Sequence, residues 1–229
     1  MSTWLTGDAV AFDIETTGVD VHNDRIVTAC AVRVGKDGAK FLGRWLLDPG
    51  VPIPESATAI HGITTEKART DGMAAFGGII TMAGVLLRAW NEGLPVVVMN
   101  AQFDLTLLQA ELARHGQEPL SIGPVLDPLV IDRGLEPYRK GKRTLAALAE
   151  RYKVKQDGAH SSDGDALTAA RIVWAQAREH WPIEKYTLAE MQAWQAECHR
   201  KWAANLEIHR RSLGKPEVID GDWPVRNAA

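Results

Sequence analysis

Acidic side chains fall into three short blocks of this sequence, with types and spacings that could build one reactive site. The first block holds Asp13 and Glu15, the second holds Asp104, and the third holds Asp165 with His160 five residues before it. Carboxylates gathered in one cleft repel one another, so they are typical of sites that bind divalent cations. A histidine with an ordinary pKa of about 6.5 could take a proton from a water molecule there. The blocks therefore indicate a metal-dependent hydrolytic site.

The first block lies on a strand that we expect over residues 10–15. Side chains two positions apart on a strand share a face, so Asp13 and Glu15 would project together while their neighbours enter the core. Thr16 begins a tight turn at Gly18, where the backbone can approach a ligand closely. Judged alone, alternating charge of this kind is also common on a half-solvated strand.

The other two blocks lie at expected helix starts. Asp104 follows a short strand that ends near Asn100, and sites in open α/β sheets form beyond the carboxyl ends of strands. Asp165 falls in the first turn of a later helix. An acid in a first turn also favours the helix dipole, so both aspartates have a purely structural alternative, and Asp163 is an equal candidate for the helix cap.

Taken together, the blocks resemble the motifs of the DEDDh (DnaQ-like) 3′–5′ exonuclease family, which includes the proofreading subunit of bacterial replicative DNA polymerase. The family pattern places a histidine five residues before the last aspartate, which selects Asp165 over Asp163. The resemblance covers residues 10–172. The motifs read Phe-Asp-Ile-Glu-Thr-Thr-Gly over residues 12–18, Asn-Ala-Gln-Phe-Asp over 100–104 and His-Ser-Ser-Asp-Gly-Asp over 160–165, with weaker matches at 60–64 and 144–152.

The resemblance implies a ribonuclease H-like α/β fold, with a mixed five-stranded sheet flanked by helices and a C-terminal helical extension. It also implies hydrolysis of terminal phosphodiester bonds at the 3′ end of single-stranded DNA, in proofreading or repair, with release of nucleoside 5′-monophosphates. His160 is the expected general base. Two Mg²⁺ or Mn²⁺ ions, which favour hard oxygen ligands, would be held by Asp13, Glu15, Asp104 and Asp165. The expected substrate contacts are Thr16, His61, Asn100 and Phe103.

Several alternatives stay open in the sequence. RNA or short oligoribonucleotides could replace DNA, since discrimination by the 2′-hydroxyl depends on a few pocket contacts. The chain could also be a non-catalytic, nucleic-acid-binding accessory of a polymerase, although four uncompensated carboxylates have no evident use in such a protein. His61 could be a plain turn residue, and Phe103 a core residue and not one that stacks on a base.

Hydrophobic patterning predicts the elements that must position these residues. Three prolines between residues 48 and 54 predict a loop that ends near residue 62. Strands followed by alternating helices and strands indicate an α/β fold with a mixed sheet. Strands are expected at 10–15, 25–34 and 41–47 as an antiparallel meander, and again at 95–99 and 125–131. Helices are expected at 75–90, 103–115, 145–152 and after 163.

The chain is expected to divide into an exonuclease domain over residues 1–182 and a C-terminal helical extension and tail over 183–229. Apolar residues three or four apart predict one long amphipathic helix over 188–211. Its tryptophans could pack on the same domain, on a second copy of the chain or on a DNA polymerase. The sequence of residues 183–211 does not choose among these partners.

The composition is that of a globular protein, because 45% of the 229 residues are apolar and 24% are charged. No secretory leader is evident and no apolar run approaches roughly 20 residues, so a cytoplasmic protein without membrane contact is expected. The net charge is −3, and the four motif carboxylates account for the acidic excess. Residues 139–155 carry seven basic side chains against one acidic, and this stretch could hold substrate phosphates upstream of the cleaved bond.

Overall fold

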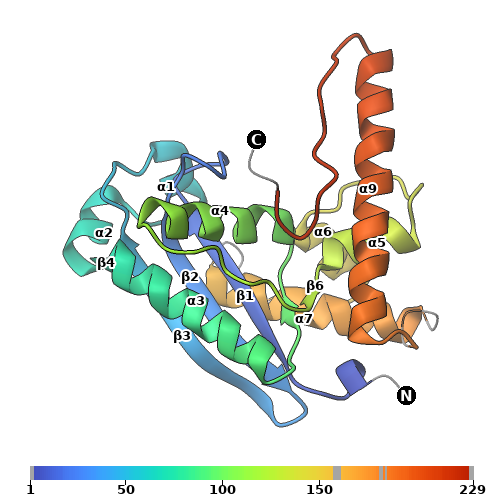
Figure 1. Cartoon of the computed structure of the whole chain (residues 1–229), viewed down its shortest axis with the longest axis horizontal. Coiled ribbons are helices and arrows are strands. Elements are labelled where there is room, and N and C mark those ends of the chain that lie inside the picture. Colours follow the sequence, from blue (N-terminus) through green and yellow to red (C-terminus); the bar gives the residue numbers. More distant parts are fainter. Residues whose placement is uncertain (1–2, 157–160, 181–182, 184, 227–229) are drawn as a thin grey trace.

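A mixed six-stranded sheet forms the centre of the protein. The computed structural model describes residues 3–156, 161–180, 183 and 185–226. The strands lie in the order β4-β3-β2-β1-β5-β6 (Figure 1). As expected, the first three strands form an antiparallel meander, whereas β5 and β6 run parallel to β1, and β4 runs parallel to β3. The strands are β1 (Ala9–Thr16), β2 (Ile26–Gly35), β3 (Gly38–Asp48), β4 (Met73–Ala74), β5 (Val96–Val97) and β6 (Val125–Leu126).

Helices cover both faces of the sheet, so the protein has three layers. Buried residues of α3 and α4 form one core with the sheet, and buried residues of α7 form a second core on the other face. A short 3-10 helix, Thr3–Leu5, precedes β1. The helices are α1 (Glu55–His61), α2 (Thr65–Asp71), α3 (Ala75–Asn91), α4 (Ala101–Arg114), α5 (Pro128–Leu135), α6 (Leu145–Arg151), α7 (Ser162–Glu179) and α9 (Leu188–Ser212).

Alternate residues of β1 enter the two cores. Phe12 and Ile14 lie in the core beneath α3 and α4. Ala11 lies in the core beneath α7. Because side chains alternate along a strand, Asp13 and Glu15 share the side of Ala11, toward α7. The expected strand therefore presents both of its carboxylates to one face, near its carboxyl end.

Two parts of the sheet region differ from expectation. The sheet has six strands and not five, because β4 pairs with the end of β3 through Leu47↔Met73 and Asp48↔Ala74. The loop expected over residues 48–62 contains α1. This helix ends at Gly62, whose φ of 76° is a left-handed conformation that glycine adopts without steric cost.

The strand expected over residues 125–131 ends after two residues. Asp127 caps α5 by accepting hydrogen bonds from the N–H groups of Leu129 and Val130. Pro128 follows at the first helical position, where its missing N–H is not needed. The chain therefore turns from strand to helix at the Asp-Pro pair.

The C-terminal helix α9 packs on the sheet edge, and it confirms the long helix expected over residues 188–211. Gln195 Oε1 accepts a hydrogen bond from Asp127 N at 2.8 Å, and Gln195 Nε2 donates to Val125 O at 2.9 Å. Gln192 Oε1 accepts from Val125 N at 3.0 Å. These two side chains satisfy the outer edge of β6 much as another strand would.

The tail after α9 returns to α4 (Figure 1). Gln102 Nε2 donates a hydrogen bond to Asp222 O at 2.7 Å, and Arg226 N donates to Thr106 Oγ1 at 2.9 Å. Both parts of the C-terminal segment thus contact elements from the first 182 residues. In the described part of the chain, no helix combines the length and hydropathy of a membrane span.

Candidate active site

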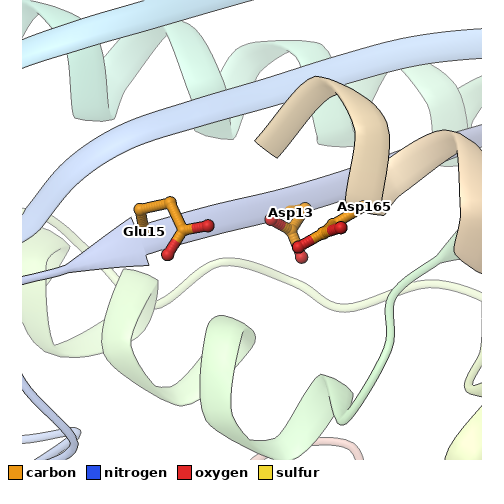
Figure 2. A group of neighbouring side chains, drawn as sticks. All are labelled: Asp13, Glu15 and Asp165. Carbon is orange, nitrogen blue, oxygen red and sulfur yellow. The ribbon is translucent and has the colours of Figure 1, made fainter. Parts of the chain in front are cut away.

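Carboxylates from two elements meet near the end of β1 (Figure 2). Asp13 and Glu15 project from β1, and Asp165 projects from the first turn of α7. One carboxylate oxygen of each lies within 4.8 Å of the others. Oxygen atoms at this spacing can share a divalent cation.

Asp104 joins this group from a third element. It lies in the first turn of α4, is 4% exposed, and its Oδ1 accepts a hydrogen bond from Ile14 N at 3.2 Å. Ile14 lies between Asp13 and Glu15 in the sequence. The hydrogen bond therefore holds the start of α4 against the part of β1 that carries these two carboxylates. The four carboxylates singled out in the sequence therefore lie at one place in the fold.

Burial and mutual repulsion raise the pKa of two of these carboxyl groups. The pKa of Asp13 is well above its usual value, first because of burial and then because of the negative charges of Asp104, Glu15 and Asp165. The pKa of Asp104 is also raised, chiefly by burial, although the hydrogen bond from Ile14 opposes this. Bound protons or cations would relieve the repulsion. An oxygen-only donor set of this kind fits Mg²⁺ or Mn²⁺ better than zinc.

The first turn of α7 separates the two aspartates that the sequence left in competition. Asp163 pairs with Arg44 of β3. Asp165 instead lies beside Asp13. The geometry thus agrees with the motif spacing, which selects Asp165. His160, the expected general base, lies outside the described residues.

A cleft of about 280 Å³ opens beside the carboxylates and is lined by Glu15, His61 and the start of α7. His61 Nδ1 accepts a hydrogen bond from Ile63 N at 3.1 Å. Burial lowers the pKa of His61, so the ring is mainly neutral at pH 7. Thr16 donates its hydroxyl hydrogen to Gly18 O at 2.6 Å. His61 therefore faces the cleft, whereas the Thr16 hydroxyl stabilises the turn after β1.

Asn100 and Phe103 flank Asp104 at the start of α4. Asn100 is exposed and left-handed, with φ 63° and ψ 48°, a conformation in which asparagine is enriched among residues other than glycine. Phe103 is half-buried and packs against the core beneath α3 and α4. Part of the Phe103 ring is therefore packed in the core, and the rest of the ring is accessible to a ligand.

Asp127 is a buried carboxylate that the sequence patterns missed. It is 1% exposed, and it accepts hydrogen bonds from Asn100 N at 3.0 Å and Ala101 N at 2.9 Å. These bonds hold the turn between β5 and α4, which delivers Asp104 to the site. The Asp-Pro pair was the available signal for a helix cap, but the strand expected over residues 125–131 concealed it.

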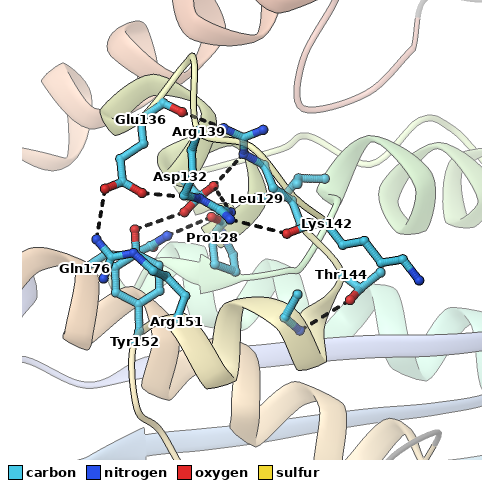
Figure 3. Close-up of polar contacts among 12 residues, drawn as sticks. Pro128, Leu129, Asp132, Glu136, Arg139, Lys142, Thr144, Arg151, Tyr152 and Gln176 are labelled. Atoms are coloured by element: carbon cyan, nitrogen blue, oxygen red, sulfur yellow. Dashed lines mark hydrogen bonds and ion pairs between the residues drawn. The ribbon is translucent and has the colours of Figure 1, made fainter.

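Much of the basic stretch over residues 139–155 is paired inside the protein (Figure 3). Asp132 is fully buried, and its carboxylate also accepts a hydrogen bond from Tyr152 Oη at 3.0 Å. The expectation that the whole stretch contacts phosphates is therefore too broad. Three arginines form internal ion pairs: Arg139 and Arg143 with Asp132, and Arg151 with Glu136 and Glu179.

Comparison with known protein families accounts for the group of four carboxylates. Residues 10–173 match the family model for exonucleases of the RNase T type. The chain belongs to the exonuclease family. The matched segment includes all four carboxylates and both elements that carry the acidic group of Figure 2.

Relatives of this exonuclease-family chain include much larger proteins. A DNA polymerase III PolC-type protein of Lacticaseibacillus paracasei is 30% identical over 181 residues, which are 76% of this chain and 12% of the relative. A DNA polymerase III subunit epsilon-like protein of Rhodobacter capsulatus is 32% identical over 166 residues, which are 70% of this chain and 22% of the relative. The chain therefore spans only a small share of the length of these relatives.

Solved exonuclease structures share the fold. The structure of exonuclease I aligns with a TM-score of 0.63 and 18% identity, and the alignment covers 77% of this chain and 42% of that protein. Escherichia coli exonuclease I in complex with a dT13 oligonucleotide aligns with a TM-score of 0.59 and 17% identity, over 78% of this chain and 42% of that protein. The expected ribonuclease H-like α/β fold is thus confirmed, with one more strand than expected.

Proposed function

We propose that this chain is a divalent-metal-dependent 3′–5′ exonuclease that shortens single-stranded DNA in proofreading or repair. The observation that carries the proposal is the convergence of Asp13, Glu15, Asp104 and Asp165 beside an open cleft. Membership of the exonuclease family supports the reaction class. The polymerase III relatives and the dT13 complex of exonuclease I support single-stranded DNA as the substrate.

The four carboxylates would hold two Mg²⁺ or Mn²⁺ ions. Their mutual repulsion and oxygen-only chemistry fit such ions. When bound, the ions would offset negative charge on the attacking and leaving oxygens of an in-line displacement.

The other groups of the chain would bind the DNA end and move a proton. His160 would accept a proton from the attacking water at a ring nitrogen. His61 and the turn at Thr16 would contact the terminal nucleotide from the cleft side. Phe103 would stack on its base with the accessible part of the ring, and Asn100 would orient the sugar and phosphate. The product would be a nucleoside 5′-monophosphate.

Nucleotide release from a single-stranded DNA 12-mer tests this proposal. Asp13→Asn, or a chelator added to the wild type, should abolish release. Asp71→Asn is the matched control, because Asp71 is exposed and, among the described residues, pairs only with Lys67 on its own helix. Substantial digestion that survives either treatment would refute the metal role, and faster digestion of an RNA 12-mer would assign the activity to RNA.

Association with a DNA polymerase, or with a second copy of the chain, through residues 183–211 is a further proposal. One side of α9 is already committed to the protein's own core, since Met191, Gln195, His199 and Ala203 are buried. A partner would therefore contact the opposite, exposed side. We also propose that residues 1–182 act as the exonuclease domain and that 183–229 extend it.

A further inference from the structure

A pocket of about 590 Å³ lies between the end of α5, the loop after it and α9, and shares no lining residue with the carboxylate cleft. Its aromatic walls are Tyr138, Trp194 and Trp202. Its charged side chains are Arg133 and Lys201, and no acidic residue of the described part of the chain lines it, although Lys201 pairs with Glu197 at 3.3 Å on its own helix. The pocket therefore combines aromatic surface with one cationic side chain, Arg133, that has no ion pair in the described part of the chain.

Arg133 is a partly buried cation without a direct counter-ion. Its guanidinium group lies 3.5 Å from the centre of the Trp202 ring, and within the described residues it forms no ion pair or hydrogen bond. The neighbouring Asp132 is already paired with two other arginines (Figure 3). Asp127, the other nearby carboxylate, is bonded to backbone N–H groups. Burial lowers the pKa of Arg133 to about 10, so an anion in the pocket would relieve an electrostatic cost.

The rim of the pocket presents an exposed aromatic ring. Tyr138 is 93% exposed. Lys140 and Lys142 follow it in the sequence and are exposed, and neither forms an ion pair with a described residue, but neither of them lines the pocket. A strand of nucleic acid that enters the pocket would therefore meet the Tyr138 ring at the rim and the positive charge of Arg133 inside.

The floor of the pocket depends on a close approach of α5 and α9. A Cβ atom at Gly134 would lie 2.6 Å from Cys198 Sγ and 2.7 Å from the Trp194 ring. Such contacts are too short for any side chain, so only glycine allows the two helices to meet here. The shape of the pocket thus depends on the close packing of α5 against α9 at Gly134.

We propose that this pocket is an accessory site for single-stranded nucleic acid, in which Arg133 binds a phosphate and Tyr138 stacks on a base. Single-stranded nucleic acid alternates anionic phosphates with planar bases. A phosphate would match the Arg133 cation, and a base would match the exposed Tyr138 ring. An acidic peptide would satisfy Arg133 but would have no regular planar group for Tyr138. The inference rests on the proposed function, because it adds an upstream contact to a strand whose 3′ end lies at the carboxylates.

Binding of dT12 in the presence of a chelator tests the pocket without requiring catalysis. Tryptophan fluorescence reports binding, since Trp194 and Trp202 line the pocket. Tyr138→Ala, at an exposed position that tolerates the change, should weaken dT12 binding by about tenfold, as expected for the loss of one stacked base. Arg133→Gln should weaken binding by a similar factor and lower the slope of log affinity against log salt by about one.

Arg200→Gln is the matched control, because it removes a charge from the exposed side of α9 outside the pocket. It should leave dT12 affinity within about twofold of the wild type, in line with the small effect of an exposed ion pair. Unchanged dT12 affinity in both Tyr138→Ala and Arg133→Gln would overturn the proposal, whether or not the chain is a nuclease. Unchanged affinity together with binding of a poly-glutamate peptide would assign the pocket to an acidic protein segment.

Discussion

Replacing Asp127 by asparagine should show whether this residue positions Asp104 in addition to stabilising the fold. Asp127 Oδ1 accepts hydrogen bonds from Asn100 N, Leu129 N and Val130 N, and Oδ2 accepts from Ala101 N and Trp223 Nε1. Asparagine keeps one acceptor oxygen but places an amide donor where the other oxygen stood. At least two N–H groups then lose their acceptor.

The size of the effect follows from these bonds. A hydrogen bond to a charged group contributes roughly 1.5–3 kcal/mol. The lost bonds are partly offset because a neutral amide is less costly to bury than a carboxylate, whose pKa is here raised by burial. We expect a net loss of about 2–4 kcal/mol, or roughly 5–15 °C in melting temperature for a chain of this size.

Activity should fall further than stability alone would explain. The bonds from Asn100 and Ala101 hold the turn that places Asp104 beside β1. A displacement of about 1 Å at a catalytic group can cost on the order of 100-fold in rate. Asp127→Asn should therefore lower kcat by about that factor and weaken Mn²⁺ binding by about 10-fold or more, with KM for the DNA changed only slightly.

Asp132→Asn is the matched control for this experiment. Asp132 is equally buried but is bonded to the side chains of Arg139, Arg143 and Tyr152, and not to the start of α4. It should lower the melting temperature while leaving Mn²⁺ affinity near the wild-type value. If both variants lose stability and neither loses Mn²⁺ affinity, then Asp127 is only a structural residue and the reasoning fails.

Two further predictions concern the metal-free site and the sheet edge. Because the folded state raises the pKa of Asp13 and Asp104, it retains protons that the unfolded chain has released, and stability falls as pH rises through the raised values. Mg²⁺ should therefore raise the melting temperature more at pH 8 than at pH 5 in a thermal shift assay, and an equal rise would contradict this. Gln195→Leu removes two hydrogen bonds from the edge of β6, so it should cost about 1–3 kcal/mol and speed amide exchange at Asp127, whereas unchanged exchange would show that the edge is held by other contacts.

Elements with a clear hydrophobic period or a recognisable helix cap were predictable from the sequence. Apolar and acidic residues alternate over residues 12–15 of β1, so the sequence places Asp13 and Glu15 on one face, as observed. Helix α6 begins where Thr144 supplies a cap, and its side chain accepts a hydrogen bond from Ala147 N. Local chemistry and burial agree in these segments, which is why their positions follow from pattern alone.

The two-residue strands β4 and β6 were not predictable, because one polar side chain or one tertiary contact decides where they end. The strand at 125–131 looks apolar throughout, yet the cap at Asp127 and the proline after it start a helix. The two residues of β4 have no strand pattern of their own and pair only because α2 returns the chain to β3. Hydrophobic periodicity carries little information over so few residues.

The role of the C-terminal segment was hidden for a different reason. Gln195 is fully buried and His199 is 2% exposed, although both residue types normally indicate a solvated face. Their burial is tolerated because the sheet edge and the returning tail supply partners, namely Val125, Asp127 and the carbonyl of Asp220. Hydrogen bonds, and not apolar contacts alone, therefore fix the orientation of α9. One of them reaches Asp127, and Asp127 holds the turn before Asp104, so the geometry of the acidic site depends on a helix that lies outside the exonuclease motifs.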